Sequence, residues 1–221
     1  MEAILRPRIK ICCISSKEEA RLAISYGADA LGLVSQMPSG PGVISEELIV
    51  EIAKSIPPPI ASFLLTSLQD AEAIIEQQRR CRTNTLQLVD RLPPGSHQRL
   101  REALPGIALV QVIHVRGPEA LEEALEVAPF VDALLLDSGR PDLPVKILGG
   151  TGQVHDWTIS RRIREAVSIP IFLAGGLSAE NARAAVEEVA PFGLDLCSSV
   201  RTDGRLDPQK LERFFRALGR L

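Results

Sequence analysis

Short apolar runs alternate with amphipathic segments along the 221 residues of the chain. Short aliphatic or β-branched runs that lie between polar or glycine-containing turns predict β-strands. The predicted strands are Arg8–Cys12, Ala30–Val34, Ile60–Leu64, Thr85–Leu88, Ala108–Ile113, Ala133–Asp137, Ile169–Ala174 and Leu194–Cys197. Apolar positions three or four residues apart predict helices between them. These lie near Lys17–Tyr26, Glu46–Ile56, Leu68–Arg80, His97–Leu104, Pro118–Val127, Trp157–Val167, Ala179–Val189 and Pro208–Leu218.

A predicted helix follows every predicted strand, and this order is typical of a parallel sheet covered by helices. Most of the strands are apolar throughout rather than alternating, which indicates that both faces of the sheet are buried. Eight such units predict a (β/α)8 TIM barrel, formed by a single domain over residues 1–221. The alternative is an open, doubly wound sheet, but no Gly-x-Gly-x-x-Gly motif follows the first strand.

Composition narrows the class of function. The net charge of −3 and the pI near 5.7 argue against a nucleic-acid or anionic membrane partner. No apolar run reaches the roughly 18 residues of a membrane span, and the N-terminus lacks the features of a secretory signal. We expect a cytoplasmic protein, either a monomer or a homodimer, with a small-molecule partner.

Cysteine and histidine usage gives no sign of a disulfide or a metal site. The cysteines Cys12, Cys13, Cys81 and Cys197 are adjacent or isolated, and neighbouring cysteines rarely bridge each other. We expect all of them to be reduced thiols. None of the three histidines is spaced with a second histidine or cysteine as a zinc site requires, so we expect no metal.

Reactive side chains end two of the predicted strands, Cys12 the first and Asp137 the sixth. Both should emerge at the C-terminal face of the barrel, where TIM-barrel enzymes have their active sites. A thiol and a carboxyl group at that face could serve as base and acid in proton transfer. A free cysteine is often only a small buried residue, and that remains the alternative for Cys12. Cys13 is expected to point away from Cys12 and to pack.

The loops after the seventh and eighth strands suggest a phosphate site. TIM barrels commonly bind phosphate with these two loops, which here contain Gly175-Gly176 and Ser198-Ser199. Glycine lets backbone N–H groups approach an anion closely, and the serine hydroxyls add donors. The alternative for Gly175-Gly176 is a tight turn with no ligand.

Several groups of motifs follow one another in the order found in one enzyme family. They are Lys10-Ile11-Cys12, Tyr26–Gly32, Leu136-Asp137 with Gly149–Gly152 and Asp156-Trp157, Ala174–Leu177 with Glu180-Asn181, and Asp195–Ser198. In these motifs the chain resembles the phosphoribosylanthranilate isomerases, (β/α)8 enzymes of tryptophan biosynthesis. The resemblance implies an Amadori rearrangement of an aminoaldose phosphate to an aminoketose phosphate, without a cofactor.

The resemblance also assigns roles to residues. It implies that Asp137 is the general acid that opens the furanose ring and that Cys12 is the general base that removes the proton from C2. It places the substrate phosphate at Gly175, Gly176, Ser198 and Ser199, and further substrate contacts at Lys10, Gln87, Gly150 and Asp195. The connection from Ser138 to Asp156 is long enough to form an active-site lid.

The chain departs from the family at positions around this site. The family's loop after strand two carries an arginine that meets the anthranilate carboxylate, whereas residues 37–43 contain no arginine. The family's Cys-Gly is Cys12-Cys13, its Gln-Leu-His-Gly is Gln87–Asp90, and its Ser-Gly-Val-Glu is Ser198–Arg201. Arg140 or Arg201 could replace the lost cation.

Three functions are therefore open. The first is phosphoribosylanthranilate isomerase activity, and the second is that of a paralogue acting on or binding another phosphorylated sugar or amine. The third is a non-catalytic binding barrel. The missing arginine separates the first from the second, and the retained Cys12 and Asp137 argue against the third.

Overall fold

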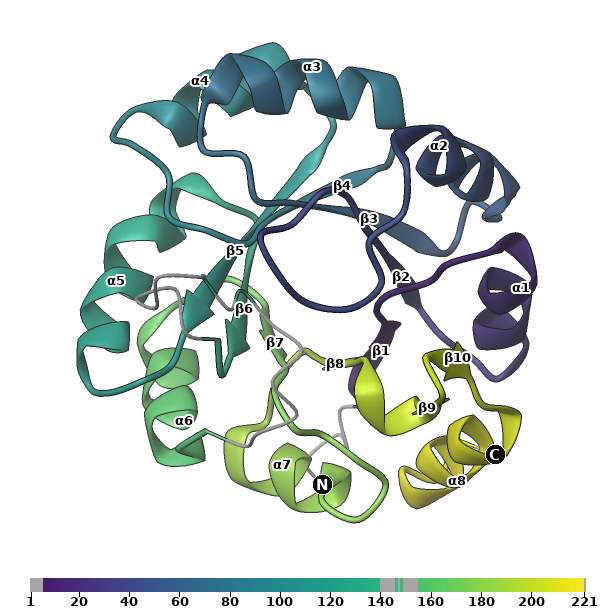
Figure 1. Cartoon of the computed structure of the whole chain (residues 1–221). Helices are drawn as coiled ribbons and strands as arrows, with labels where there is room; N and C mark the ends of the chain where they lie inside the picture. Colours follow the sequence, from purple (N-terminus) through teal and green to yellow (C-terminus); the bar gives the residue numbers. More distant parts are fainter. Residues whose placement is uncertain (1–5, 140–145, 147, 149–154, 221) are drawn as a thin grey trace.

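A computed structural model describes residues 6–139, 146, 148 and 155–220 of the chain. Eight parallel strands follow one another in sequence order around a closed barrel, and β1 pairs with β8 to close it (Figure 1). This confirms the predicted (β/α)8 barrel and excludes the open sheet. The strands are β1 Arg8–Ile11, β2 Ala30–Val34, β3 Ala61–Thr66, β4 Thr85–Leu88, β5 Ala108–His114, β6 Ala133–Asp137, β7 Ile171–Leu173 and β8 Gly193–Leu196.

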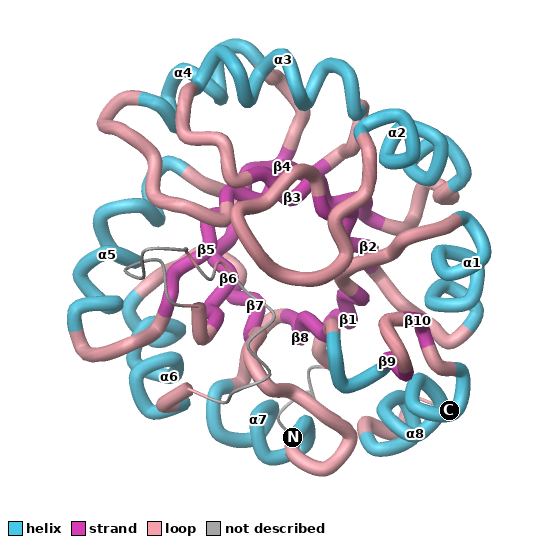
Figure 2. Tube along the Cα trace, in the orientation of Figure 1, coloured by secondary structure: helices cyan, strands magenta, loops and turns pink. Residues whose placement is uncertain are grey.

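Helices surround the barrel, and each follows its strand as the sequence predicts (Figure 2). They are α1 Lys17–Ser25, α2 Glu46–Ser55, α3 Ala71–Cys81, α4 Ser96–Ala103, α5 Glu119–Val127, α6 Trp157–Ala166, α7 Ala182–Val189 and α8 Pro208–Ala217. Short 3-10 turns, η1 Ala128–Phe130 and η2 Ser198–Val200, and an antiparallel pair, β9 Arg201–Thr202 and β10 Arg205–Leu206, complete the described elements. No helix in the described ranges has the length and apolar content of a membrane span.

Two strands are shorter than the sequence predicts, for identifiable reasons. β1 ends at Ile11 rather than Cys12 because Cys13, with φ of 62°, turns the backbone out of the extended conformation. The N–H of Cys12 still donates to the carbonyl of Leu196, at 2.7 Å. β7 begins after Pro170, which has no N–H to contribute to the ladder.

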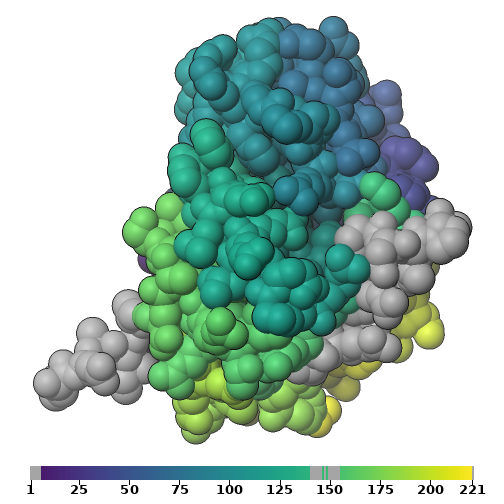
Figure 3. Space-filling model, turned by 90° about the vertical axis from the view of Figure 1, so that its left-hand side faces the viewer, coloured from purple at the N-terminus to yellow at the C-terminus, as the bar shows by residue number. Residues whose placement is uncertain are grey.

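Side chains alternate between two apolar layers along each strand. Ile9 and Ile11 of β1 pack outward against the helices, whereas Cys12 belongs to the layer inside the barrel. Phe63 and Phe172 meet edge to face within this inner layer, with ring centroids 5.8 Å apart. From the side, the helices on the α4–α6 flank form a closed surface (Figure 3). In such a barrel the functional groups lie at the carboxyl ends of the strands.

Candidate active site

A pocket lies where the carboxyl ends of the strands meet, as expected for a barrel enzyme. It is lined by both predicted proton-transfer residues, Cys12 after β1 and Asp137 at the end of β6. The loop after β2 curves over the barrel opening (Figure 2). Other predicted site residues in the lining are Gln87, Gly175, Gly176, Asp195, Ser198 and Ser199. Gly150 lies outside the described residues.

Asp137 is positioned by the backbone at the end of its strand. It is 8% exposed, and its Oδ1 accepts a hydrogen bond from the N–H of Ser138 at 2.7 Å. His155 lies close enough to Asp137 for the negative charge of that carboxylate to raise its pKa, whereas burial of the imidazole lowers it. Burial dominates and lowers the pKa of His155, whose Nε2 lies 2.7 Å from the Ser160 hydroxyl. Nothing in the sequence indicates that His155 lies near Asp137.

Lys10 and Asp195 form a buried ion pair beneath the pocket. The closing strand pair β1–β8 sets them opposite each other, and Nζ lies 2.9 Å from Oδ2. Burial lowers the pKa of Lys10, but the charges of Asp195 and Cys12 outweigh it, so the net shift is upward. The Lys10 ammonium, which is fully buried, also lies 5.2 Å from the centre of the Phe63 ring.

Cys13 does not point away from Cys12, and that prediction was wrong. Its φ of 62° turns its side chain into the pocket, where both thiols belong to the lining. A hydrogen bond from Cys13 lowers the pKa of Cys12; burial opposes this shift and the positive charge of Lys10 adds to it. The same hydrogen bond raises the pKa of Cys13. Cys12 is therefore the thiol that is set up to carry the negative charge.

The loop after β7, which the sequence predicts to bind phosphate, turns at two consecutive glycines. Gly175 and Gly176 have φ of 81° and 63°, a conformation that side chains rarely adopt. The Asn181 side chain fixes this loop, since its Nδ2 donates to the Gly176 carbonyl at 2.9 Å and its Oδ1 accepts from Ser178 N–H at 2.8 Å. In the neighbouring loop, the Ser199 hydroxyl is buried without a hydrogen-bond partner among the described residues.

The sequence model of the family of N-(5′-phosphoribosyl)anthranilate isomerases matches residues 9–217 of the chain. The chain belongs to this family. N-(5′-phosphoribosyl)anthranilate isomerase 2 of Methanosarcina mazei is 37% identical over 209 residues, which cover 94% of this chain and 92% of the relative. The enzyme of Methanocella arvoryzae is 32% identical over 208 residues, which cover 94% of this chain and 95% of the relative.

Solved structures of phosphoribosylanthranilate isomerases share the fold. The Thermotoga maritima enzyme superposes with a TM-score of 0.83 at 28% identity, covering 97% of this chain and all of the other. A second structure has a TM-score of 0.80 at 26% identity, and the match covers 97% of this chain and all of the other. It holds reduced 1-(o-carboxyphenylamino)-1-deoxyribulose 5-phosphate.

Cys13 restricts which residue can stand at position 42 in the loop after β2. Gly42 has φ of 80°, and a Cβ added to it would lie 2.4 Å from the Cβ of Cys13. Real Cβ atoms do not approach so closely, so no side chain fits at position 42 while Cys13 is present. A cation for the aryl carboxylate therefore cannot project from Gly42.

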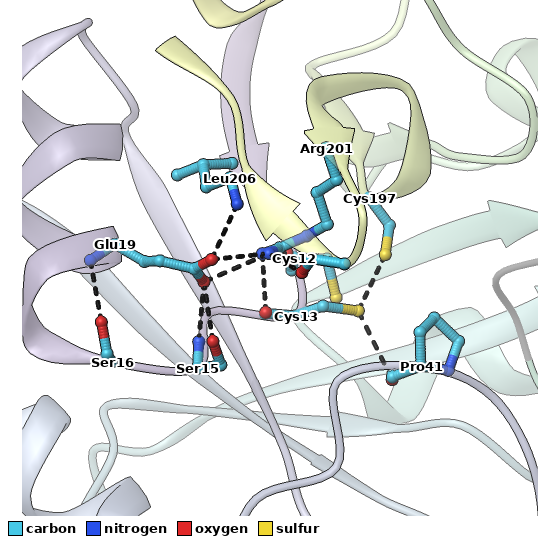
Figure 4. Close-up of polar contacts among 10 residues, drawn as sticks. Cys12, Cys13, Ser15, Ser16, Glu19, Pro41, Cys197, Arg201 and Leu206 are labelled. Carbon is cyan, nitrogen blue, oxygen red and sulfur yellow. Dashed lines mark hydrogen bonds and ion pairs between the residues drawn. The ribbon is translucent and has the colours of Figure 1, made fainter.

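Arg201 does not replace that cation. Its side chain is only 7% exposed and pairs with Glu19, at 2.9 Å (Figure 4). Its second amino group donates to the carbonyls of Cys12 and Cys13, at 3.0 and 2.6 Å. Arg201 is thus committed to holding the turn after β1. Arg140, the other candidate, lies outside the described residues.

The altered segment after β4 carries a second ion pair. Asp90 accepts a hydrogen bond from Lys146 Nζ, at 2.5 Å, and its side chain is only 9% exposed. The Lys146 carbonyl in turn accepts the Ser39 hydroxyl, at 2.6 Å. These contacts connect the loops after β2, β4 and β6 at the rim of the pocket. Sequence reasoning named the change at Asp90 but not its partner.

Proposed function

We propose that this protein converts N-(5′-phosphoribosyl)anthranilate to the corresponding aminoketose phosphate by an Amadori rearrangement. The observation that carries the proposal is that one pocket contains Cys12, Asp137 and both loops assigned to the phosphate. Family membership supports the same reaction, an aldose–ketose isomerisation. The Thermotoga maritima relative is dimeric and also exists as generated monomers, so both states stay open for this chain.

Asp137 opens the sugar ring in this proposal. Its carboxyl group donates a proton to the furanose ring oxygen as the bond from that oxygen to C1 breaks. The lone pair of the substrate nitrogen then forms the C1 iminium, which supplies the electron sink for the next step. The backbone hydrogen bond from Ser138 holds one oxygen of Asp137 in place and so fixes the orientation of the other.

Cys12 removes the proton from C2 in the second step. The electrons of the C2–H bond move toward the iminium and give an enolamine, which becomes the ketone after protonation at C1. The lowered pKa of Cys12 supports this role, because a larger fraction of the thiol is then present as thiolate near neutral pH. The ammonium of Lys10 contributes to that lowering from beneath the pocket.

Unpartnered polar atoms support a polar ligand in the same pocket. Buried polar atoms are normally hydrogen-bonded, so those without a protein partner mark places where a ligand or water contributes one. Among the described residues, Gln87 Oε1, Asp195 Oδ1 and Ser199 Oγ are buried without such a partner, and all three residues line the pocket. The first two accept hydrogen bonds from sugar hydroxyls in our proposal, and the third binds the phosphate.

Gly176→Ala is expected to raise KM for the phosphorylated substrate about tenfold, equivalent to about 1.4 kcal/mol, with a smaller change in kcat. A Cβ strains the left-handed backbone and moves the loop that binds the phosphate. Steady-state kinetics measures the effect. Gly106→Ala is the matched control, since Gly106 has φ of 83° with open space around it. An equal rise in KM in both variants would contradict a phosphate site at this loop.

Cys13→Ala is expected to move the acidic limb of the kcat/KM profile to higher pH. The thiolate of Cys12 is the active base, so activity rises as that thiol loses its proton. The hydrogen bond from Cys13 lowers the pKa of Cys12 from its ordinary value, and the variant lacks this donor. The buried, remote Cys81→Ala is the control. An unmoved limb in Cys13→Ala would mean that Cys13 does not tune the base.

Growth of a tryptophan auxotroph tests the function as a whole. A strain that lacks phosphoribosylanthranilate isomerase is expected to grow without tryptophan when it expresses this protein. The Asp137→Asn variant, expressed to the same level, should not restore growth. Failure of a well-expressed, folded wild-type protein to restore growth would argue for a different phosphorylated substrate.

A further inference from the structure

Two thiols from opposite ends of the chain meet at the edge of the pocket. Cys13 follows β1 and Cys197 follows β8, and their Sγ atoms lie 2.8 Å apart (Figure 4). A disulfide has an S–S length of about 2.05 Å, so the sulfurs need to approach by only about 0.8 Å to bond. No group of three metal-ligating side chains occurs among the described residues. The geometry therefore favours a covalent bond between two sulfurs over a metal site.

The backbone on the Cys13 side is held firmly. Arg201 donates to the carbonyls of Cys12 and Cys13, and its guanidinium also pairs with the Glu19 carboxylate. Glu19 accepts further hydrogen bonds from the N–H of Leu206, at 2.8 Å. Because this buried network links the turn after β1 to the segment after β8, it keeps the two thiols together without help from solvent.

A small oxidant can reach this pair from the pocket. Cys13 and Cys197 both line the pocket, and Cys197 is partly exposed. Cys81 offers the contrast within the same chain, since it is fully buried at the end of α3 and does not line the pocket. Oxidation of thiols follows exposure and thiolate character, so the pocket thiols should react before Cys81.

We propose that Cys13 and Cys197 are a site of reversible oxidative modification, which takes peroxides as its oxidant and forms a Cys13–Cys197 disulfide. One sulfur attacks the peroxide oxygen, the O–O bond breaks, and a sulfenic acid and water form from hydrogen peroxide. The second thiol displaces hydroxide from that sulfur, which leaves as a second water molecule. Two thiols are oxidised by two electrons and the peroxide is reduced by two. An external dithiol reverses the reaction by exchange.

The disulfide should also inactivate the proposed isomerase, and this consequence rests on the proposed function. Oxidised Cys13 no longer has the S–H that donates to Cys12, so the pKa of the base rises. The new bond also ties the turn after β1 to Cys197, the residue before the proposed phosphate-binding Ser198 and Ser199. Bond formation itself is measured without substrate, so the two proposals can fail separately.

Peptide mapping after peroxide treatment tests the modification. The full-length protein is exposed to hydrogen peroxide, alkylated without reduction, and digested with trypsin. We expect a linked pair of peptides, residues 11–17 and 184–201, which separates after reduction. The link should persist in Cys12→Ser and Cys81→Ala and vanish in Cys13→Ser and Cys197→Ser, whose folding is checked by circular dichroism.

Other products would overturn the proposal. A link that persists in Cys13→Ser but vanishes in Cys12→Ser would assign the bond to Cys12, and a bridge between two chains would show an intermolecular reaction. Complete alkylation of Cys13 and Cys197 after peroxide treatment would show that the pair does not oxidise. Loss of at least about 90% of turnover on oxidation, regained on adding dithiothreitol, is expected for the wild type. Retained turnover in the linked protein would show that the disulfide forms but does not inactivate the enzyme.

Discussion

Asp137→Asn and Cys12→Ser are each expected to lower kcat by at least about 10²-fold while the melting temperature changes little. Asparagine keeps the shape of Asp137 but cannot donate the proton that opens the ring. Serine is close in size to cysteine, but its hydroxyl is a far weaker base than a thiol whose pKa is lowered. Steady-state turnover, normalised to folded protein, measures both effects.

Asp203→Asn is the matched control for the acid. Asp203 is exposed in the turn between β9 and β10, outside the pocket lining, and its positive φ suits asparagine. This variant should retain wild-type turnover. If Asp137→Asn or Cys12→Ser keeps more than about a tenth of the wild-type rate, the proton-transfer role given to that residue is wrong.

Lys10→Met is expected to lower the free energy of unfolding by about 3–5 kcal/mol. The substitution leaves the Asp195 carboxylate buried, with a side chain only 9% exposed and without its partner. Such an uncompensated charge is costly because burial removes it from water. Chemical denaturation at neutral pH measures the loss. The variant should also have a higher Cys12 pKa, since the Lys10 charge lowers that pKa.

Lys17→Met provides the comparison for this loss. Lys17 pairs with Glu51 at 3.0 Å, but the two side chains are 38% and 61% exposed. An exposed pair of this kind contributes about 1 kcal/mol or less. In the double variant Lys10→Met with Asp195→Asn, the cost should be smaller than in Lys10→Met alone. A loss in Lys10→Met no larger than in Lys17→Met would show that the buried pair does not hold the barrel closure together.

The sequence predicts the fold and the places of the main site residues because period and order carry that information. Continuous apolar strands followed by helices predict a parallel sheet covered by helices, and eight such units favour a barrel, in which the last residue of a strand lies at the C-terminal face. Asp137 is therefore placed from the sequence alone. The sequence also places Cys12 correctly at the C-terminal face, although β1 ends one residue before it.

The sequence does not predict features that depend on unusual backbone conformation or on distant partners. Cysteine rarely adopts positive φ, so nothing in the residue type indicates that Cys13 turns toward Cys12. Arg201 pairs with Glu19 across a separation of 182 residues in the sequence, and Lys146 pairs with Asp90 across a separation of 56. Such pairs depend on how the loops fold over the barrel, which local periodicity does not encode.

The proposed activity is the isomerisation of N-(5′-phosphoribosyl)anthranilate by Cys12 and Asp137. It is tested most directly by the turnover of purified protein with this substrate, beside the folded double variant Cys12→Ser with Asp137→Asn. We expect the wild type to form the aminoketose phosphate and the double variant to form it no faster than buffer. A folded wild type that leaves the substrate unchanged would show that this activity is wrong, and a double variant that converts it at the wild-type rate would show that these two residues do not perform it.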